Sequence, residues 1–159
     1  MTMTHRERVL KFIRPEMETI FSLEEYAERL QRVKAGMAAA GIDMLYLTSP
    51  EAICYLSGFR AEWYQAQGPM SWLPVSGLAV HVDGDDYIHF EVQNEQVIAG
   101  FTSVSRDLRI FGGDAQPGDD VLDFIVDELD GEGWLKGRVG LEMYSYCPNR
   151  AVSEMLQAA

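Results

Sequence analysis

Basic residues are scarce in this chain, and no long apolar run occurs in it. Thirteen Lys and Arg residues stand against twenty-five Asp and Glu residues in a chain of 159, which gives a formal net charge of −12. Such a surface repels phosphate backbones and anionic lipids, so we expect neither nucleic acid nor a membrane as a partner. No stretch approaches the roughly 20 apolar residues that a membrane-spanning helix needs. The acidity by itself indicates solubility and does not point to a function.

Cysteine is rarer still. The two cysteines, Cys54 and Cys147, both lie inside apolar segments. Residues 1–20 are charged throughout and contain no apolar core of a secretion signal. Free thiols buried in a reducing cytoplasm fit this pattern best, while the sequence leaves a disulfide between the two open. We therefore expect a cytoplasmic protein.

Motifs of catalysis are also missing. There is no glycine-rich phosphate loop, no HExxH and no CxxC. His81, His89 and Glu91 flank an acidic turn at residues 83–86 and form the one cluster with metal-ligand side chains. A metal site requires that they share a face, which depends on a strand register that the sequence does not fix. A solvated turn is the simpler interpretation, so we expect no catalytic residue and no metal site in this chain.

The sequence does contain clear signals for the ends of two helices. Ser22 and Glu25 have the spacing of a capping box, and Gly41 suits the left-handed end of the helix that follows them. Ser49 suits the start of a second, shorter helix, and Gly58 suits its end. These two helices are the best-defined elements of the sequence.

The remaining periodicity alternates between strands and helices. Strands are predicted at 44–48, 78–82, 87–92, 104–111 and 138–143, and further helices from Asn94 to about Gly100, over 121–129 and over 148–156. The second and third strands form a hairpin, and the unbroken apolar run of the first predicts a strand covered on both faces. We therefore predict a single α/β domain over residues 21–159, with a mixed β-sheet flanked by helices, preceded by an N-terminal arm over residues 1–20.

Residues 60–74 form an unusual loop, because they carry Trp63, Tyr64 and Trp72. Loops are normally polar and exposed, whereas large aromatic side chains gain stability from being covered. These three side chains therefore either fold back on their own domain or meet another surface.

Four segments together resemble the N-terminal domain of the creatinase, prolidase and aminopeptidase P family. They are residues 21–29, 41–50, 53–59 and 139–142, and the resemblance extends over nearly the whole chain from Phe21. Members of this family are two-domain enzymes in which a C-terminal pita-bread domain carries catalysis. That domain usually holds two divalent metal ions through Asp, Asp, His, Glu and Glu, and creatinase itself uses no metal. The resemblance implies that the catalytic domain is absent from this chain, which is then expected to be inactive and to bind no cofactor.

The resemblance also implies a location for function. In the family, the segment matching residues 55–59 turns toward the active-site mouth of the neighbouring subunit in a homodimer. Six residues are thereby predicted to line that entrance or to contact the partner: Tyr55, Phe59, Arg60, Trp63, Tyr64 and Trp72. Creatinase has a substrate-binding arginine after this segment, and Arg60 stands too early to match it. The substrate of the parent enzyme is left open among an Xaa-Pro dipeptide, creatine and another small nitrogen or sulfonium compound.

Two functions follow as hypotheses. The first is a non-catalytic N-terminal domain of a creatinase-like or Xaa-Pro dipeptidase-like hydrolase, which supports dimerisation and lines the neighbour's active-site entrance. The second is a free-standing α/β module that binds a small ligand beneath Trp63 and Trp72.

Overall fold

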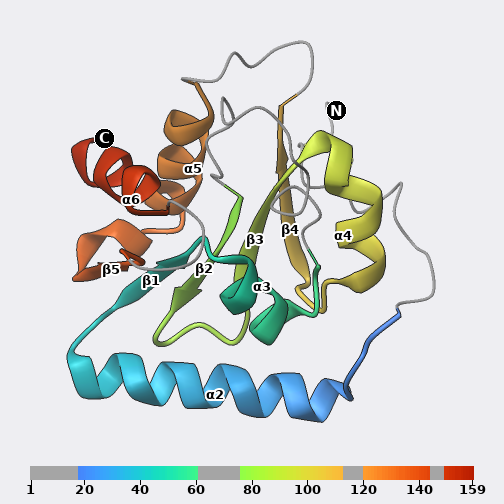
Figure 1. Cartoon of the computed structure of the whole chain (residues 1–159). Helices are drawn as coiled ribbons and strands as arrows, with labels where there is room; N and C mark the ends of the chain where they lie inside the picture. The colour runs from blue at the N-terminus through green and yellow to red at the C-terminus, as the bar shows by residue number, and fades with distance from the viewer. Residues whose placement is uncertain (1–17, 61–75, 113–119, 144–148) are drawn as a thin grey trace, which may run out of the picture.

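A mixed β-sheet with helices on both faces forms the core of the protein (Figure 1). The computed structural model describes residues 18–60, 76–112, 120–143 and 149–159. Within these residues the sheet has five strands in the order β4-β3-β2-β1-β5. The strands are β1 (Met44–Leu47), β2 (Gly77–His81), β3 (Tyr87–Val92), β4 (Asp107–Phe111) and β5 (Val139–Leu141). The predicted single α/β domain with a mixed sheet is confirmed.

Strand direction gives the sheet one distinctive edge. β1 is parallel to β5, β3 is parallel to β4, and β2 is antiparallel to both β1 and β3. Of the described strands, β2 alone therefore runs opposite to the others. The carboxyl ends of β1, β3, β4 and β5 consequently lie at the same edge of the sheet.

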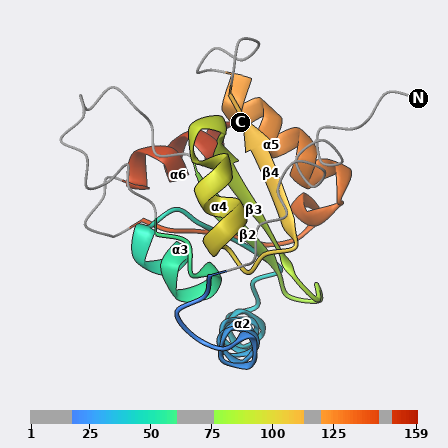
Figure 2. The same cartoon turned by 90° about the vertical axis from the view of Figure 1, so that its right-hand side faces the viewer.

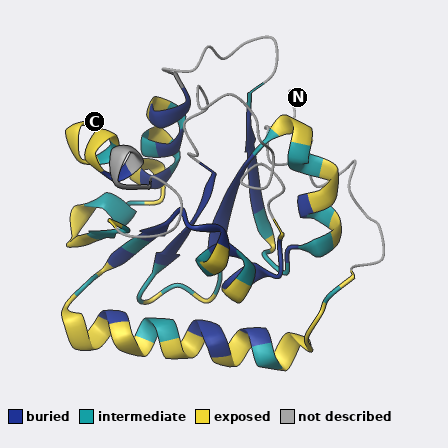
Figure 3. Ribbon diagram, in the orientation of Figure 1, coloured by how far each residue is buried: buried dark blue, intermediate teal, exposed yellow. Residues whose placement is uncertain are grey.

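Helices cover the two faces of this sheet in two groups (Figure 2). Helices α2 (Leu23–Ala40), α3 (Pro50–Ser57) and α4 (Gln96–Thr102), with the short 3-10 turn η1 (Gln93–Glu95) before α4, lie on one face. The other face is covered by α5 (Asp120–Gly131), the 3-10 turn η2 (Trp134–Lys136) and α6 (Asn149–Ala158). Strands β1 to β4 are mostly buried, whereas β5 is partly exposed and α2 exposes its outer side (Figure 3).

The alternation of side chains along the strands divides the core into two clusters. In β1, Leu45 and Leu47 pack toward α2 and α3, whereas Met44 and Tyr46 pack toward α5. Because residues two apart on a strand point to the same face, this is the pattern expected of a strand covered on both sides. The prediction for β1 is therefore confirmed.

The predicted helix ends are also confirmed. Ser22 Oγ accepts a hydrogen bond from Glu25 N at 3.2 Å, and Gly41 ends α2 with a φ of 64°. Ser49 Oγ accepts from Ala52 N at 3.2 Å at the start of α3. Gly58 ends α3 with a φ of 77°, and its N–H donates to Cys54 O at 3.0 Å.

Three boundaries differ from the predictions. Asn94 does not cap a helix, because it lies inside η1, and α4 begins at Gln96 without a side-chain cap and continues to Thr102. The fourth strand begins at Asp107 rather than at Val104, whose N–H donates to Ser57 O in α3. The last strand ends at Leu141, because the Glu142 side chain turns to the start of α3.

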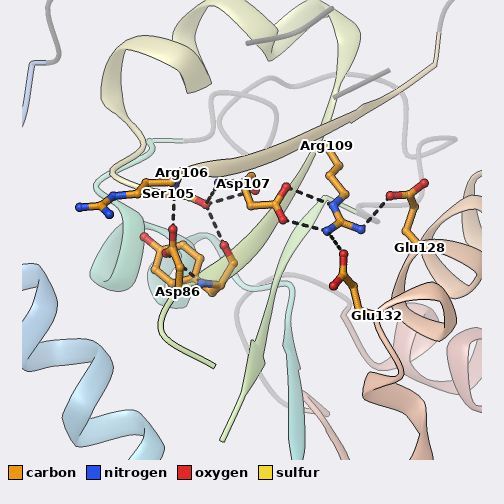
Figure 4. Close-up of polar contacts among 8 residues, drawn as sticks. Asp86, Ser105, Arg106, Asp107, Arg109, Glu128 and Glu132 are labelled. Atoms are coloured by element: carbon orange, nitrogen blue, oxygen red, sulfur yellow. Dashed lines mark hydrogen bonds and ion pairs between the residues drawn. The ribbon is translucent and has the colours of Figure 1, made fainter. Parts of the chain in front are cut away.

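Besides its apolar contacts, helix α5 is linked to the sheet by the guanidinium of Arg109 (Figure 4). Arg109 on β4 contacts Asp107 through Nε at 3.1 Å and Nη2 at 2.8 Å, Glu128 at 2.7 Å and Glu132 at 2.6 Å. Burial works against the charge of Arg109, but the hydrogen bonds that it donates to Asp107 and Glu132 outweigh this effect and raise the pKa of the guanidinium. Four of its five N–H donors are thereby used.

The hairpin register settles where the two histidines lie. Leu78 is paired with His89 and Val80 with Tyr87, so His89 lies on the face covered by α2, α3 and α4. His81 lies on the opposite face, where its ring is 5.3 Å from that of Trp134. The two imidazoles therefore do not share a site. Among the described residues, no group of three or more His, Cys, Asp or Glu side chains is arranged to hold a metal ion.

Replacement of Gly58 by alanine is expected to lower the free energy of unfolding by at least about 1 kcal/mol. Its φ is positive, and a Cβ would lie 2.6 Å from Tyr26 Oη and 3.0 Å from Thr102 O. Gly36 is the matched control, because it lies inside α2 with no neighbouring atom within 4 Å of an added Cβ. Gly36→Ala is expected to stabilise the protein by about 1 kcal/mol. Chemical denaturation measures both, and equal effects of the two substitutions would contradict the assignment.

Candidate functional site

Polar side chains gather where the four co-directional strands end. Thr48 and Ser49 follow β1, Glu142 follows β5, Glu91 lies near the end of β3, and Ser76 precedes β2, which starts at this edge. We call these five residues the polar edge. Open α/β sheets place their ligand crevices outside the carboxyl ends of their strands, so this edge is the first place to seek a function.

Glu142 fixes the start of α3 within the polar edge. Its Oε2 accepts hydrogen bonds from the backbone N–H groups of Thr48 and Ser49, both at 2.6 Å, and its Oε1 accepts from Ser49 Oγ at 2.8 Å. A carboxylate is favoured there by the partial positive charge of the helix N-terminus. The backbone oxygen of Glu142 also accepts from Ser153 Oγ in α6. Glu142 thus connects β5 and α6 to the beginning of α3.

Glu91 and His89 form a second polar group inside the core, and both are fully buried. Glu91 Oε1 accepts from Ser76 Oγ at 2.6 Å and from Val92 N at 2.7 Å. His89 Nδ1 lies 2.9 Å from Ser103 Oγ. The remaining atoms of the pair, Glu91 Oε2 and His89 Nε2, face each other at 3.7 Å, and neither has a hydrogen-bond partner.

The charge of Glu91 affects the pKa of Tyr46, whose side chain lies on the other face of the sheet. Burial, and after it the Glu91 carboxylate, raises the pKa of Tyr46. Tyr46 is itself fully buried in the cluster beneath α5 and its ring lies 6.1 Å from that of Phe90. Tyr46 therefore stays a neutral phenol, and no proton-transfer role follows for it.

The residues predicted to form an entrance or a dimer contact are distributed unevenly. Tyr55 is 41% exposed on α3, and Arg60 is exposed just after it. Phe59 is fully buried in its own domain, with its ring 5.1 Å from that of His89, so its side chain does not reach the surface. Trp63, Tyr64 and Trp72 lie outside the described residues, as does Cys147, while the thiol of Cys54 is free.

Tyr55 belongs to an exposed apolar corner. The guanidinium of Arg29 lies 4.8 Å from the Tyr55 ring and 4.1 Å from the Phe21 ring, and its Nη1 donates to Tyr55 O at 2.9 Å. Ile20 and Leu23, next to Phe21 in the chain, are also exposed. We call Ile20, Phe21, Leu23 and Tyr55 the apolar corner. The guanidinium of Arg29 thus makes cation–π contacts with both aromatic rings of the apolar corner, Phe21 and Tyr55.

Sequence reasoning missed the roles of Glu142, Ser76 and Ser103, and considered Glu91 and His89 only as metal ligands. A signal for the last two was present. His89 and Glu91 alternate with Ile88 and Phe90 in a segment that is otherwise apolar, and charged residues in a buried strand require a partner. No comparable pattern marks Glu142, whose contacts are more than ninety positions away in the chain.

These features define a small α/β domain with a mixed sheet and a polar carboxyl edge. A model of the creatinase/prolidase N-terminal domain matches residues 29–158, and the chain belongs to that family. The recognition made from the sequence segments is therefore confirmed. No curated protein sequence is significantly similar to the chain.

Solved structures support the same fold. The N-terminal domain of an Xaa-Pro dipeptidase from Lactobacillus brevis is 23% identical, with a TM-score of 0.59 over 82% of this chain and 86% of that one. An Xaa-Pro aminopeptidase from Streptococcus pyogenes is 13% identical, with a TM-score of 0.59 over 86% of each chain. A dipeptidase from Pyrococcus horikoshii is 16% identical, with a TM-score of 0.55 over 80% of this chain and 31% of its own.

In the described part of the chain, no helix combines the length and the apolar character that crossing a membrane requires.

Replacement of Glu142 by alanine is expected to lower the free energy of unfolding by about 2 kcal/mol, because the amides of Thr48 and Ser49 lose their acceptor. Glu142→Gln keeps one oxygen acceptor and is expected to cost about half as much. Hydrogen exchange of the two amides should accelerate in parallel. Asp123→Ala, at an exposed position of α5, is the control and is expected to change stability by less than about 0.5 kcal/mol. Unchanged exchange at Thr48 and Ser49 in Glu142→Ala would contradict the anchoring role.

Proposed function

We propose that this chain is the non-catalytic N-terminal domain of a creatinase-like or Xaa-Pro dipeptidase-like hydrolase. The observation that carries the proposal is the share of each solved chain that this chain matches. The chain matches 86% of a solved Xaa-Pro dipeptidase N-terminal domain, but only 31% of the solved dipeptidase from Pyrococcus horikoshii. The same fold is therefore found as the smaller part of a longer peptidase chain. Catalysis, and the divalent metal pair that most members use, belong in this proposal to a separate domain.

Within this proposal the apolar corner supports a homodimer. Exposed aromatic side chains are frequent anchors of interfaces, because they bury a large area at a low cost in side-chain entropy. Phe21 and Tyr55 are already ordered by the guanidinium of Arg29, which reduces that cost further. Ile20 and Leu23 add exposed apolar surface to the same corner. A second copy of the parent enzyme is the proposed partner.

The exit of α3 supports the second role, which is to line the active-site entrance of the neighbouring subunit. Gly58 ends the helix and Phe59 is held in the core, so the chain emerges at the exposed Arg60. The aromatic residues of the next segment follow directly in the sequence. We propose that Tyr55, Arg60, Trp63, Tyr64 and Trp72 form the lip of the entrance, with Phe59 as its buried anchor.

The compartment and the substrate are part of the proposal. The acidic composition and the two isolated cysteines support a cytoplasmic enzyme, and they also weigh against nucleic-acid and membrane partners. The substrate is a dipeptide or another small molecule that enters from the side of the dimer partner.

The 159-residue chain alone is expected to show no hydrolysis of Xaa-Pro dipeptides or of creatine. Among the described residues, Glu91 is the only buried acid and His89 is the only buried imidazole. Both lie inside the core, away from solvent. Amino-acid release with and without added Mn²⁺ measures this. A metal-dependent turnover that is lost in His81→Ala or His89→Ala would contradict the non-catalytic assignment.

In the enzyme that carries this domain, Trp63→Ala or Tyr64→Ala is expected to lower kcat/KM by about tenfold, which corresponds to ~1.4 kcal/mol of transition-state stabilisation. The melting temperature is expected to stay nearly unchanged, because a side chain at an entrance contributes little to its own core. Trp134→Phe is the matched control, since Trp134 packs on His81 at the opposite face of the sheet. A loss of several degrees with unchanged kinetics would place the aromatic segment in its own core and contradict the entrance role. If the isolated chain instead binds a small ligand with an affinity that depends on Trp63, the free-standing module is favoured.

A further inference from the structure

We propose that two copies of this chain pair through one neutral apolar face, which consists of the exposed side of α4 and the apolar corner. On α4 the exposed apolar side chains are Val97, Ile98 and Phe101, and together with the apolar corner we call them the pairing face. The inference rests on the proposed homodimer and extends it. It adds α4 to the contact and places the contact between two copies of this domain, so that the 159-residue chain pairs without a catalytic domain.

Two backbone hydrogen bonds bring α4 and the apolar corner to the same side of the domain. Glu18 N donates to Phe101 O at 2.9 Å, which places the segment just before Ile20 against the end of α4. Val104 N donates to Ser57 O at 2.8 Å, which joins the end of α3 to the residues that follow α4. Figure 2 shows the result, with α4 in front of the sheet and with α3 and α2 below it. Apolar side chains from three elements therefore lie on one side of the molecule.

Exposed apolar side chains are concentrated on this side. Ten large apolar side chains are exposed in the described residues, and seven of them belong to the pairing face, each with 36% to 60% of its surface exposed. The other three, Val139, Met143 and Met155, lie near β5 and α6. The seven side chains supply on the order of 600 Å² of apolar area per copy, or roughly 1,200 Å² for a pair, which reaches the lower end of the range for a stable interface.

The charge of the chain limits where a second copy can bind. Each copy carries a formal net charge of −12, so two copies repel each other unless they meet where acids are few. Residues 93–102, which form η1 and α4, contain a single charged residue, the half-buried Glu95. On the other face of the sheet, the twelve residues of α5 contain five acids and no base. A second copy is therefore repelled at α5 and tolerated at α4.

A second copy also fits the pairing face better than a basic partner does. A partner that recognised the acidity of this domain would be basic, and residues 93–102 offer it almost no charge. An uncharged apolar face is complementary to itself, which a two-fold contact requires because the same residues meet from both sides. In the first turn of α2, Glu25 is paired with Arg29 at 2.9 Å and with Arg32 at 3.5 Å. This acid consequently adds little repulsion near the corner.

Sedimentation equilibrium of the 159-residue chain tests the pairing. The chain is expected to form a dimer with a dissociation constant in the micromolar range, as befits a small interface. Val97→Glu and Leu23→Glu each place a carboxylate at a well-exposed position of the face, and each is expected to raise the dissociation constant by about tenfold or more. Met155→Glu makes the same change on α6 and is the matched control, expected to stay within about twofold of the parent. Thermal melts verify that the variants are folded.

The response to salt separates this contact from one held by ion pairs. Raising NaCl from about 50 mM to about 500 mM screens the repulsion between the two acidic copies and is expected to tighten the dimer severalfold. A dimer that dissociates as salt is added would depend on ion pairs, and it would contradict pairing through a neutral face.

Two further results would overturn the inference. One is a chain that stays monomeric up to about 1 mM, which would mean that the face is covered by something other than a second copy. The other is a dimer that Met155→Glu dissociates while Val97→Glu and Leu23→Glu leave it intact. Neither result affects the non-catalytic assignment, which is tested by hydrolysis. Conversely, hydrolysis by a dimeric chain would refute that assignment and leave the pairing face standing.

Discussion

An isolated helix of eight residues is too short to be stable in water, so α3 depends on contacts from the rest of the chain. These contacts come from nearly every element on its face. Glu142 binds its first turn, Arg29 donates to the carbonyl of Tyr55, and Tyr87 Oη donates to Leu56 O at 2.9 Å. At its end, Val104 N donates to Ser57 O. The position of α3 is thus determined by residues that are distant in the sequence, and the apolar corner and the chain exit at Arg60 depend on that position.

Two buried polar clusters in this domain differ in how completely their polar atoms are paired. Three carboxylates accept hydrogen bonds from four of the five N–H donors of Arg109, and Glu128 and Glu132 are partly exposed to solvent (Figure 4). That network links α5 to the edge strand β4. Glu91 and His89 are fully buried and retain two facing atoms without hydrogen bonds. Removing this carboxylate and imidazole from water is costly, and the hydrogen bond that Ser76 donates to Glu91 offsets part of the cost.

The sequence predicts the parts of this fold whose causes are local. A cap requires a side chain and an amide three residues apart, and a left-handed helix end requires glycine, so Ser22, Gly41, Ser49 and Gly58 are readable directly. Asn94 shows the limit of that reasoning, because its side chain suits a cap but the chain enters a 3-10 turn there. The polar edge is not readable in this way. The register that puts His81 and His89 on opposite faces, and the fold that brings Glu142 to Ser49, arise from pairings between distant segments.

The two proposed roles of the domain meet in α3. A partner covering the apolar corner would contact this helix at Tyr55, and the same helix delivers Phe59 to His89 one turn later. The helix is held at its start by Glu142 and at its end by the close approach of Tyr26 to Gly58. The exposed ring of Tyr55 and the chain exit at Arg60 are therefore both positioned by one short helix.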